Sequence, residues 1–128
     1  MNGKRYFFDT NAIVALLKGH PEITSVANDA DFIAMSVFSR LEFFSFSALT
    51  QADMNLFDHF VALVDVVDLS MQNQSLLDAV SAIRINSSLK LPDAIVMASA
   101  KSVGATLVTA DIKLANYAGD HAILFKPN

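Results

Sequence analysis

Short apolar runs alternate with longer segments of helical periodicity along nearly the whole chain, and this alternation constrains the fold more than any other feature. The apolar runs predict strands over residues 4–8, 32–35, 66–69, 106–109 and 122–125. The segments between them predict helices over residues 12–18, 52–64, 70–85, 91–103 and 112–117, a short one after Pro21, and one from Ser36 or Ser39 to about Leu49. Strands that alternate with helices form a parallel sheet covered on both faces. We therefore expect an α/β protein with three layers, α/β/α, around a central, mostly parallel sheet.

The length and composition fit a single domain over residues 1–128. The chain is 53% hydrophobic with 4 glycines and 3 prolines, so it can bury a core and has the composition of neither a linker nor a repeat array. It has no cysteine, which excludes disulfides, thiolate nucleophiles and cysteine-based metal centres. Its apolar runs are far shorter than the roughly 18 residues of a membrane helix, and no signal-peptide pattern opens it. We expect a cytoplasmic protein that does not enter a membrane.

The net charge of the chain is weakly negative, and aspartate makes up most of its acidic residues. A net charge of −4 argues against a broad basic face for nucleic acid, so any contact with RNA must be local. The 13 acidic residues are all aspartates except Glu22 and Glu42. Aspartate serves at helix caps, turns and metal sites, so the position of each one decides how it is interpreted.

Two aspartates follow predicted strands. Asp9 comes directly after the first strand and is followed by Thr10 and Asn11, and Asp111 comes shortly after Thr109, which ends the fourth strand. Ligands of parallel sheets bind beyond the carboxyl ends of the strands, where Asp9 and Asp111 would both lie. Each could equally be a helix cap or a turn residue. The neighbouring hydroxyl and amide groups could orient carboxylates or bound waters, or could be ordinary turn polarity.

Two further acids lie on predicted helices. Glu42 is flanked by Leu41 and Phe43 and appears on the apolar side of its helix, which is unusual because glutamate is rarely buried unless it is paired. A partly exposed Glu42 that pairs with Arg40 or another nearby cation is the alternative. Asp93 follows Pro92 in the first turn of its helix, where the helix dipole favours a carboxylate; this position suits both a structural role and a metal ligand.

Together the four acids predict one divalent-cation site. Asp9, Glu42, Asp93 and Asp111 would converge on one cleft, where their like charges repel unless a cation lies between them. Oxygen ligands without histidine or cysteine suit Mg²⁺ far better than zinc. The three histidines at 20, 59 and 121 are scattered without metal-ligand spacing. The chain also has neither a glycine-rich phosphate loop nor a serine-nucleophile elbow.

Four motifs resemble those of PIN domains, and specifically those of VapC-type toxins. These are Tyr6–Asn11 with its Asp-Thr-Asn, Ser39–Glu42, Leu89–Ile95 followed by Gly104–Thr109, and Asp111. The resemblance makes Asp9, Glu42, Asp93 and Asp111 the catalytic and metal-binding acids. One departure concerns the last motif, where the family often has Asn and this chain has Ala110.

This resemblance implies a metal-dependent endoribonuclease that hydrolyses RNA phosphodiester bonds with Mg²⁺ or Mn²⁺. Thr10, Asn11 and Thr109 would support the acids. The resemblance also implies a homodimer and a VapB-like antitoxin as partner. Lys90, Arg40 and Lys113 lie near the motifs in sequence and could contact RNA or be ordinary surface charges.

Other interpretations stay open. The aromatic run Phe43, Phe44 and Phe46 could belong to the core or to an interface, because its members cannot all face one direction. A PIN-fold protein that binds RNA or protein without turnover is the first alternative function. A phospho-accepting receiver domain is the second, although no pair of aspartates follows the first strand.

Overall fold

A computed structural model describes residues 3–127 and confirms the alternation of strands and helices. In these residues the elements are β1 (Arg5–Phe8), α1 (Thr10–Leu17), α2 (Pro21–Asn28), β2 (Phe32–Ser36), α3 (Val37–Phe43), α4 (Gln51–Leu63), β3 (Asp65–Val67), α5 (Gln74–Asn86), α6 (Leu91–Ser102), β4 (Thr106–Thr109), α7 (Ile112–Ala118), the 3₁₀ helix η1 (Gly119–His121) and β5 (Ala122–Leu124).

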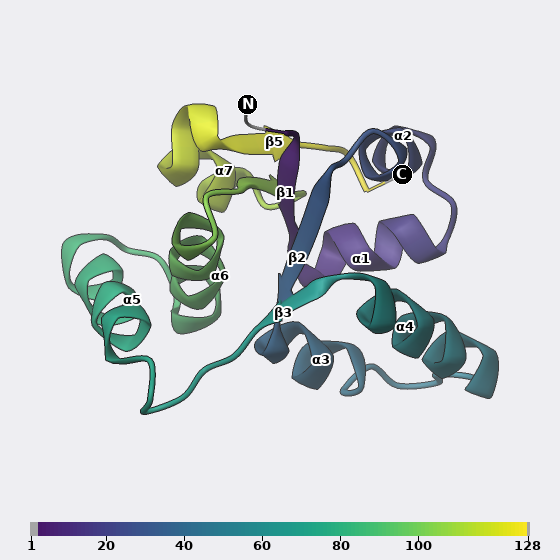
Figure 1. Cartoon of the computed structure of the whole chain (residues 1–128), viewed down its shortest axis with the longest axis horizontal. Coiled ribbons are helices and arrows are strands. Elements are labelled where there is room, and N and C mark those ends of the chain that lie inside the picture. The colour runs from purple at the N-terminus through teal and green to yellow at the C-terminus, as the bar shows by residue number, and fades with distance from the viewer. Residues whose placement is uncertain (1–2, 128) are drawn as a thin grey trace.

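The strands form one sheet in the order β3-β2-β1-β4-β5, and every neighbouring pair is parallel. Helices α5, α6 and α7 lie on one side of the sheet, and α1 to α4 lie on the other (Figure 1). The predicted three-layer α/β/α architecture is therefore confirmed, with a sheet that is entirely parallel.

Two apolar cores result from the alternation of side chains along the strands. Phe7 and Leu107 point into the core beneath α5 and α6, whereas Phe8 and Val108 point into the core beneath α1 and α4. All four are fully buried, and burial of side chains of this size stabilises the fold by about 1.5–3 kcal/mol each. Because both cores share the short strands β1 and β4, these strands are held firmly at the centre of the sheet.

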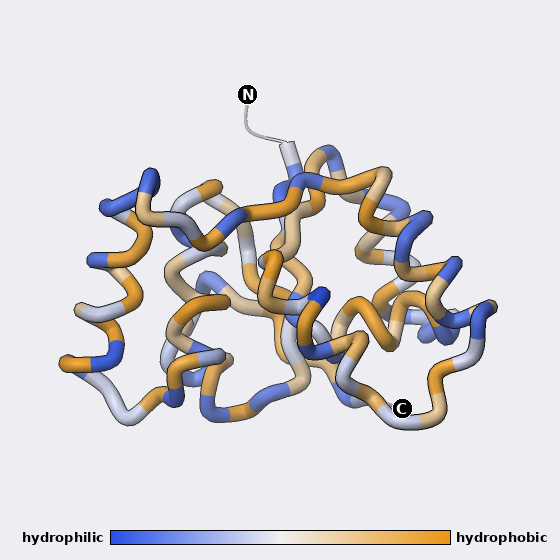
Figure 2. Tube along the Cα trace, turned by 90° about the horizontal axis from the view of Figure 1, so that it is seen from below, coloured by the Kyte–Doolittle hydropathy of each residue, from blue (hydrophilic) through white to orange (hydrophobic). Residues whose placement is uncertain are grey.

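The helices at the flanks of the molecule, such as α4 and α5, are amphipathic and short. Hydrophilic and hydrophobic residues alternate along the helices at both flanks of the molecule (Figure 2). Helices α4 and α5 have 13 residues each. Within residues 3–127 none of the helices combines the length and the hydropathy that crossing a membrane requires.

The strand order also defines where a ligand can bind. The chain builds the sheet from β1 outward through β2 to β3, and then returns to the other side of β1 to add β4 and β5. The direction of winding therefore changes between β1 and β4, and open α/β sheets bind ligands beyond the carboxyl ends of the strands at such a point. Receiver domains have the order 2-1-3-4-5, so this topology argues against the receiver alternative.

One predicted helix is wrong in its length. The helix expected to reach Leu49 ends at Phe43 and is followed by a loop in which Ala48 has a φ of 62°. The Ser45 hydroxyl donates to the carbonyl of Leu41, a local bond that competes with continued helix, and Thr50 and Asp53 form a capping box that starts α4 separately.

Two smaller boundaries also differ. Helix α5 begins at Gln74 rather than at Ser70, because the Asn73 side chain accepts a hydrogen bond from the Leu76 N–H and caps the helix there. Strand β3 covers Asp65–Val67 rather than residues 66–69. Neither shift changes the layer to which the element belongs.

Candidate active site

The four acidic residues singled out from the sequence line one small cavity at the carboxyl end of the sheet. Asp9, Glu42, Asp93 and Asp111 surround a space of about 140 Å³. They come from the ends of β1 and β4 and from helices α3 and α6. Residues separated by up to 102 positions in the sequence therefore meet at the point where the winding direction changes. Their action as catalytic groups or metal ligands stays a prediction.

Asp9 is both a helix cap and a wall of this cavity. Its Oδ1 accepts a hydrogen bond from the Ala12 N–H at 2.8 Å, so the cap role considered from the sequence is real. The side chain is buried, and burial raises the pKa of Asp9 to about 6. Hydrogen bonds from the Thr109 side chain and the Ala12 backbone act in the opposite direction, while the charges of Asp111 and Glu42 raise the pKa further. A carboxylate has two oxygens, so a cap through one leaves capacity for a cation.

Glu42 is held in place by a buried hydroxyl pair. The Thr10 hydroxyl donates to Oε1 of Glu42 and shares a second hydrogen bond, 2.9 Å long, with Oγ of Ser39. Thr10 begins α1 while Ser39 and Glu42 lie on α3, so this network fixes the carboxylate against the start of a different helix. Glu42 is partly exposed, as the alternative interpretation expected, but within residues 3–127 the only ion pair joins Lys4 to Asp29, so the pairing with Arg40 or another cation is wrong.

Asp93 lies in the first turn of α6, as predicted, and is half-buried. Burial raises the pKa of Asp93, and the negative charges of Asp111 and Glu42 raise it further. Lys90 and Lys113 act in the opposite direction. Asp93, Asp111 and Glu42 are therefore close enough for their charges to interact.

Asp111 caps α7 and is positioned by the end of β4. Its Oδ1 accepts a hydrogen bond from the Leu114 N–H, and its own N–H donates to the fully buried hydroxyl of Thr109, both at 3.0 Å. Thr109 therefore contacts both acids that follow strands. Ala110, which departs from the family pattern, packs its methyl group against the core beneath α1 and α4.

The donor set fits a hard divalent cation. The cavity offers four carboxylates and the Thr10 hydroxyl, and no histidine lines it. Two of the carboxyl groups have raised pKa values, which shows that their negative charges are poorly compensated by the protein. Within residues 3–127, however, no three acidic or histidine side chains are already gathered as a formed metal centre.

Asn11 was predicted to support the acids, and Lys113 and Arg40 to contact RNA. Asn11 is exposed at the edge of the cavity. Lys113 donates to the carbonyl of Ser88 at 3.1 Å, which ties α7 to the loop before α6. The Arg40 guanidinium lies 4.5 Å from the centre of the Phe44 ring, so its contact in this structure is with an aromatic face.

The aromatic run divides between core and surface. Phe43 is buried and stacks on Phe57 with ring centres 4.3 Å apart, and Phe44 is half-buried. Phe46 is 44% exposed and lines the acid cavity. Neither Phe46 as a cavity wall nor Ser39 as a support for the acids was identified from the sequence. The spacing of Ser39 three residues before Glu42, on one face of a helix, is the signal that could have revealed it.

Comparison with known proteins identifies the family. The model of the PIN domain family matches residues 6–120. No curated protein sequence is similar enough to this chain to count as a match.

Solved structures share the fold at low sequence identity. A toxin–antitoxin complex from Klebsiella pneumoniae contains a chain that is 24% identical, with a TM-score of 0.75, over 96% of this chain and 98% of that one. VapBC2 from Rickettsia felis, bound to a DNA fragment from its promoter, gives 22% identity and a TM-score of 0.70 over 94% and 97% of the two chains. DNA-bound VapBC from Salmonella typhimurium gives 16% identity and a TM-score of 0.69 over 98% and 99%. At these identities the likeness establishes the fold alone.

Proposed function

Since this chain belongs to the PIN domain family, we propose that it is a metal-dependent endoribonuclease of the VapC toxin type, acting on RNA in the cytoplasm. The observation that carries the proposal is the convergence of Asp9, Glu42, Asp93 and Asp111 on one cavity of about 140 Å³. These four residues would hold Mg²⁺ or Mn²⁺. The bound cation would supply an activated water and would stabilise the negative charge that develops on the phosphate.

The protein's own contribution is to position and charge the cavity. Thr10 and Ser39 hold Glu42 by buried hydrogen bonds, so the carboxylate needs little reorganisation. Thr109 orients Asp111 through the backbone and Asp9 through the side chain. Val96 and Leu114 form apolar walls that limit the access of water and strengthen electrostatic interactions inside.

Attraction of RNA must come from local features, because the net charge of the chain is −4. Lys90 and Lys113 are exposed and close enough to lower the pKa of Asp93. With a cation in the cavity the local charge changes towards positive, which favours phosphate. We therefore expect RNA binding to depend on divalent metal more strongly than on the basic side chains.

We also propose a homodimer and a VapB-like antitoxin as partners. Support for the antitoxin comes from the shared fold with chains of toxin–antitoxin complexes, including two VapBC assemblies bound to DNA. The homodimer is proposed from the family resemblance alone. Size-exclusion chromatography with light scattering tests the dimer. Co-expression with a VapB-like protein, followed by an inhibition assay, tests the antitoxin.

RNA cleavage tests the main proposal. Purified protein is incubated with structured and unstructured RNAs in Mn²⁺ or Mg²⁺, and with EDTA as the control. We expect cleavage that EDTA and Asp9→Asn both abolish, while Asp58→Asn, an exposed aspartate on α4, leaves it unchanged. Intact RNA across the panel would overturn the nuclease proposal.

The alternative is a binding module without turnover. Ala110 in the last motif and the lack of a broad basic face, at a net charge of −4, motivate this alternative. Calorimetric titration with Mn²⁺ separates the two functions when it is run beside the cleavage assay. Metal binding without RNA cleavage supports the module.

A further inference from the structure

One edge of the sheet is a short strand that a single aromatic residue anchors. Strand β5 has three residues, lies at the edge beside β4, and leaves Leu124 47% exposed. The next residue, Phe125, is only 3% exposed and packs into the core beneath α1 and α4. Its backbone N–H donates to the carbonyl of Thr109 at 3.0 Å and extends the pairing of β4 with β5. Backbone pairing opens most readily at such strand ends, so this bond depends on how firmly Phe125 is held.

Thr109 connects this edge of the sheet to the acid cavity. Its carbonyl accepts the Phe125 N–H, while its buried hydroxyl accepts the Asp111 N–H at 3.0 Å. The same side chain hydrogen-bonds to the Asp9 carboxylate. On the inner side of β4 the Asp9 N–H donates to the Val108 carbonyl at 3.3 Å. The positions of both acids therefore depend on the end of β4, and Phe125 holds the outer side of that end.

His20, which follows α1, holds Phe125 in place. Its ring packs edge-on against the Phe125 ring, with ring centres 5.5 Å apart at 79°. Its Nε2 lies 2.7 Å from the carbonyl of Lys126, and because a carbonyl only accepts, Nε2 is the donor. Nδ1 then carries the lone pair that accepts the Ile23 N–H at 3.4 Å and caps α2. We call His20, Phe125 and Lys126 the clasp.

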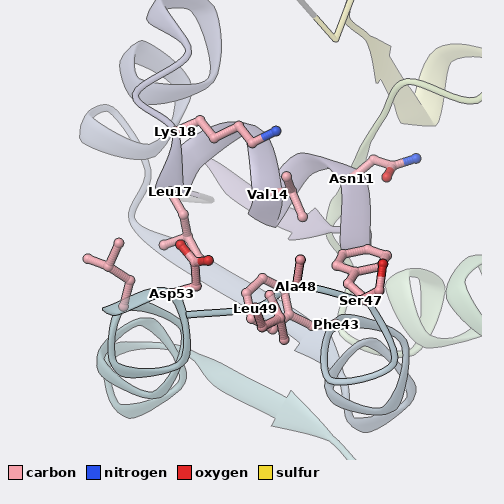
Figure 3. A pocket seen from close by; sticks show the side chains of 11 residues that line it. Asn11, Val14, Leu17, Lys18, Phe43, Ser47, Ala48, Leu49 and Asp53 are labelled. Carbon is pink, nitrogen blue, oxygen red and sulfur yellow. The ribbon is translucent and has the colours of Figure 1, made fainter. Parts of the chain in front are cut away.

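The clasp is separate from the acid cavity, because none of its three residues lines that cavity. Asn11, which does line it, and Lys18, which lies two residues before His20, are at opposite ends of α1 (Figure 3). A helix of eight residues such as α1 is about 12 Å long. Any effect of His20 on the acids must therefore pass through the protein, and the hydrogen bonds of Phe125 and Thr109 provide the connection.

We propose that the clasp positions Asp9 and Asp111 for cation binding by holding the Thr109 end of β4. This inference rests on the proposed nuclease function and adds His20 to it as a positioning residue. When the clasp opens, the Phe125 N–H leaves the Thr109 carbonyl, and the Thr109 hydroxyl no longer fixes the two acids relative to each other. Groups that orient metal ligands in this way raise metal affinity, because the ligands are already in place when the metal binds.

Two substitutions at His20 separate the clasp from the helix cap. Asparagine places an acceptor near the position of Nδ1, so it caps α2, but it is too short to reach the carbonyl of Lys126. Glutamine places its amide nitrogen near the position of Nε2 and can still donate to that carbonyl. His20→Asn therefore opens the clasp and His20→Gln restores it. His59→Asn, at an exposed position on α4, is the matched control.

Amide hydrogen exchange in the metal-free protein, measured by NMR, tests the connection. His20→Asn should speed exchange at Phe125 and at Asp111 by about 3- to 10-fold, the factor that one hydrogen bond is worth. His20→Gln and His59→Asn should exchange as the wild type does. The Ile13 N–H, which donates to the Asp9 carbonyl in α1, should be unchanged throughout. Faster exchange at Phe125 alone, a uniform increase that includes Ile13, or no change in His20→Asn would each overturn the proposal.

Calorimetric titration with Mn²⁺ tests the consequence for the acids. His20→Asn should bind Mn²⁺ about 3- to 10-fold more weakly than the wild type does. Thr109→Val, which removes a direct partner of the acids, should cost more, about 10- to 100-fold. Added to Thr109→Val, His20→Asn should cause no further loss, because the hydroxyl through which it acts is already gone. Additive losses, or wild-type affinity in His20→Asn, would contradict the proposal.

Failure of the clasp and failure of the nuclease function give different results. If the wild type binds no Mn²⁺, the nuclease proposal fails, and the exchange rate at Asp111 still decides whether the clasp holds the acids. If the wild type cleaves RNA and His20→Asn binds Mn²⁺ equally well, the nuclease proposal stands and the clasp is a structural contact only.

Discussion

Replacement of Asp9 by asparagine should stabilise the metal-free protein at neutral pH. The pKa of Asp9 is raised from 3.8 to about 6, mainly by burial, so the folded protein holds this proton more tightly than the unfolded chain does. The free energy of unfolding therefore falls as the pH rises from about 4 to about 6, and above pH 6 this loss of stability has reached its full size. A shift of this size corresponds to about 3 kcal/mol at roughly 1.4 kcal/mol for each pH unit.

Asparagine removes this titration and keeps the helix cap. Its amide oxygen can still accept the Ala12 N–H, and asparagine is as good a cap as aspartate. The new amide N–H groups need acceptors in a buried place, which offsets part of the gain. We expect Asp9→Asn to be about 1–3 kcal/mol more stable than the wild type at pH 7.5, which raises the melting temperature by about 4–12 °C in a domain of this size.

Thermal and urea unfolding in EDTA at pH 4.0, 5.0, 6.0 and 7.5 provide the assay. The difference between Asp9→Asn and wild type should grow with pH, whereas Asp58→Asn should follow the wild type at each pH because Asp58 is exposed. Asp93 contributes in the same direction in both proteins and cancels in the comparison. A constant difference across this range, or a variant less stable than the wild type at pH 7.5, would refute the reasoning.

The remaining predictions concern the metal, the hydroxyl network and the aromatic core. Millimolar Mg²⁺ or Mn²⁺ should raise the melting temperature of the wild type, and Asp93→Asn should weaken that response; unchanged melting curves in both proteins would count against the site. Mn²⁺ affinity should drop by up to tenfold between pH 7 and pH 5, because the proton on Asp9 competes with the metal below about pH 6. Calorimetric titration at both pH values measures this, and equal affinities would contradict it. Thr10→Val should cost about 1–3 kcal/mol in urea unfolding and reduce RNA cleavage, while Thr10→Ser should preserve both, since only the serine keeps the bonds to Ser39 and Glu42. Phe43→Ala should cost about 3–5 kcal/mol, because the ring is buried against Phe57, and a loss below 1 kcal/mol would show that the stack is not part of the core.

The sheet and its layers could be predicted from the sequence because local patterns determine them. Fully buried strands such as β1 and β4 appear as short apolar runs, and Pro92 and Gly104 mark the two ends of α6 and its loop. Asp9 and Asp111 could be placed at strand ends for the same reason. Their additional role as helix caps was one of two open interpretations, and the structure shows that the cap and the cavity involve the same side chains.

The region after Glu42 could not be predicted because its structure depends on tertiary contacts. The spacing of Phe38, Leu41, Phe44 and Leu49 fits one helix that continues to Leu49, but Leu41 is 60% exposed and Phe43 is the buried residue. The stack of Phe43 on Phe57 joins α3 to α4, and no local signal reveals such a contact.

Anomalous diffraction from crystals of the protein soaked in Mn²⁺ tests the central claim most directly. The account predicts a manganese peak within coordination distance of carboxylate oxygens from Asp9, Asp93 and Asp111, with Glu42 bound directly or through water, and loss of the peak in Asp9→Asn crystals. A peak located elsewhere on the protein, or no peak at millimolar Mn²⁺, would contradict the claim that these acids share a cation.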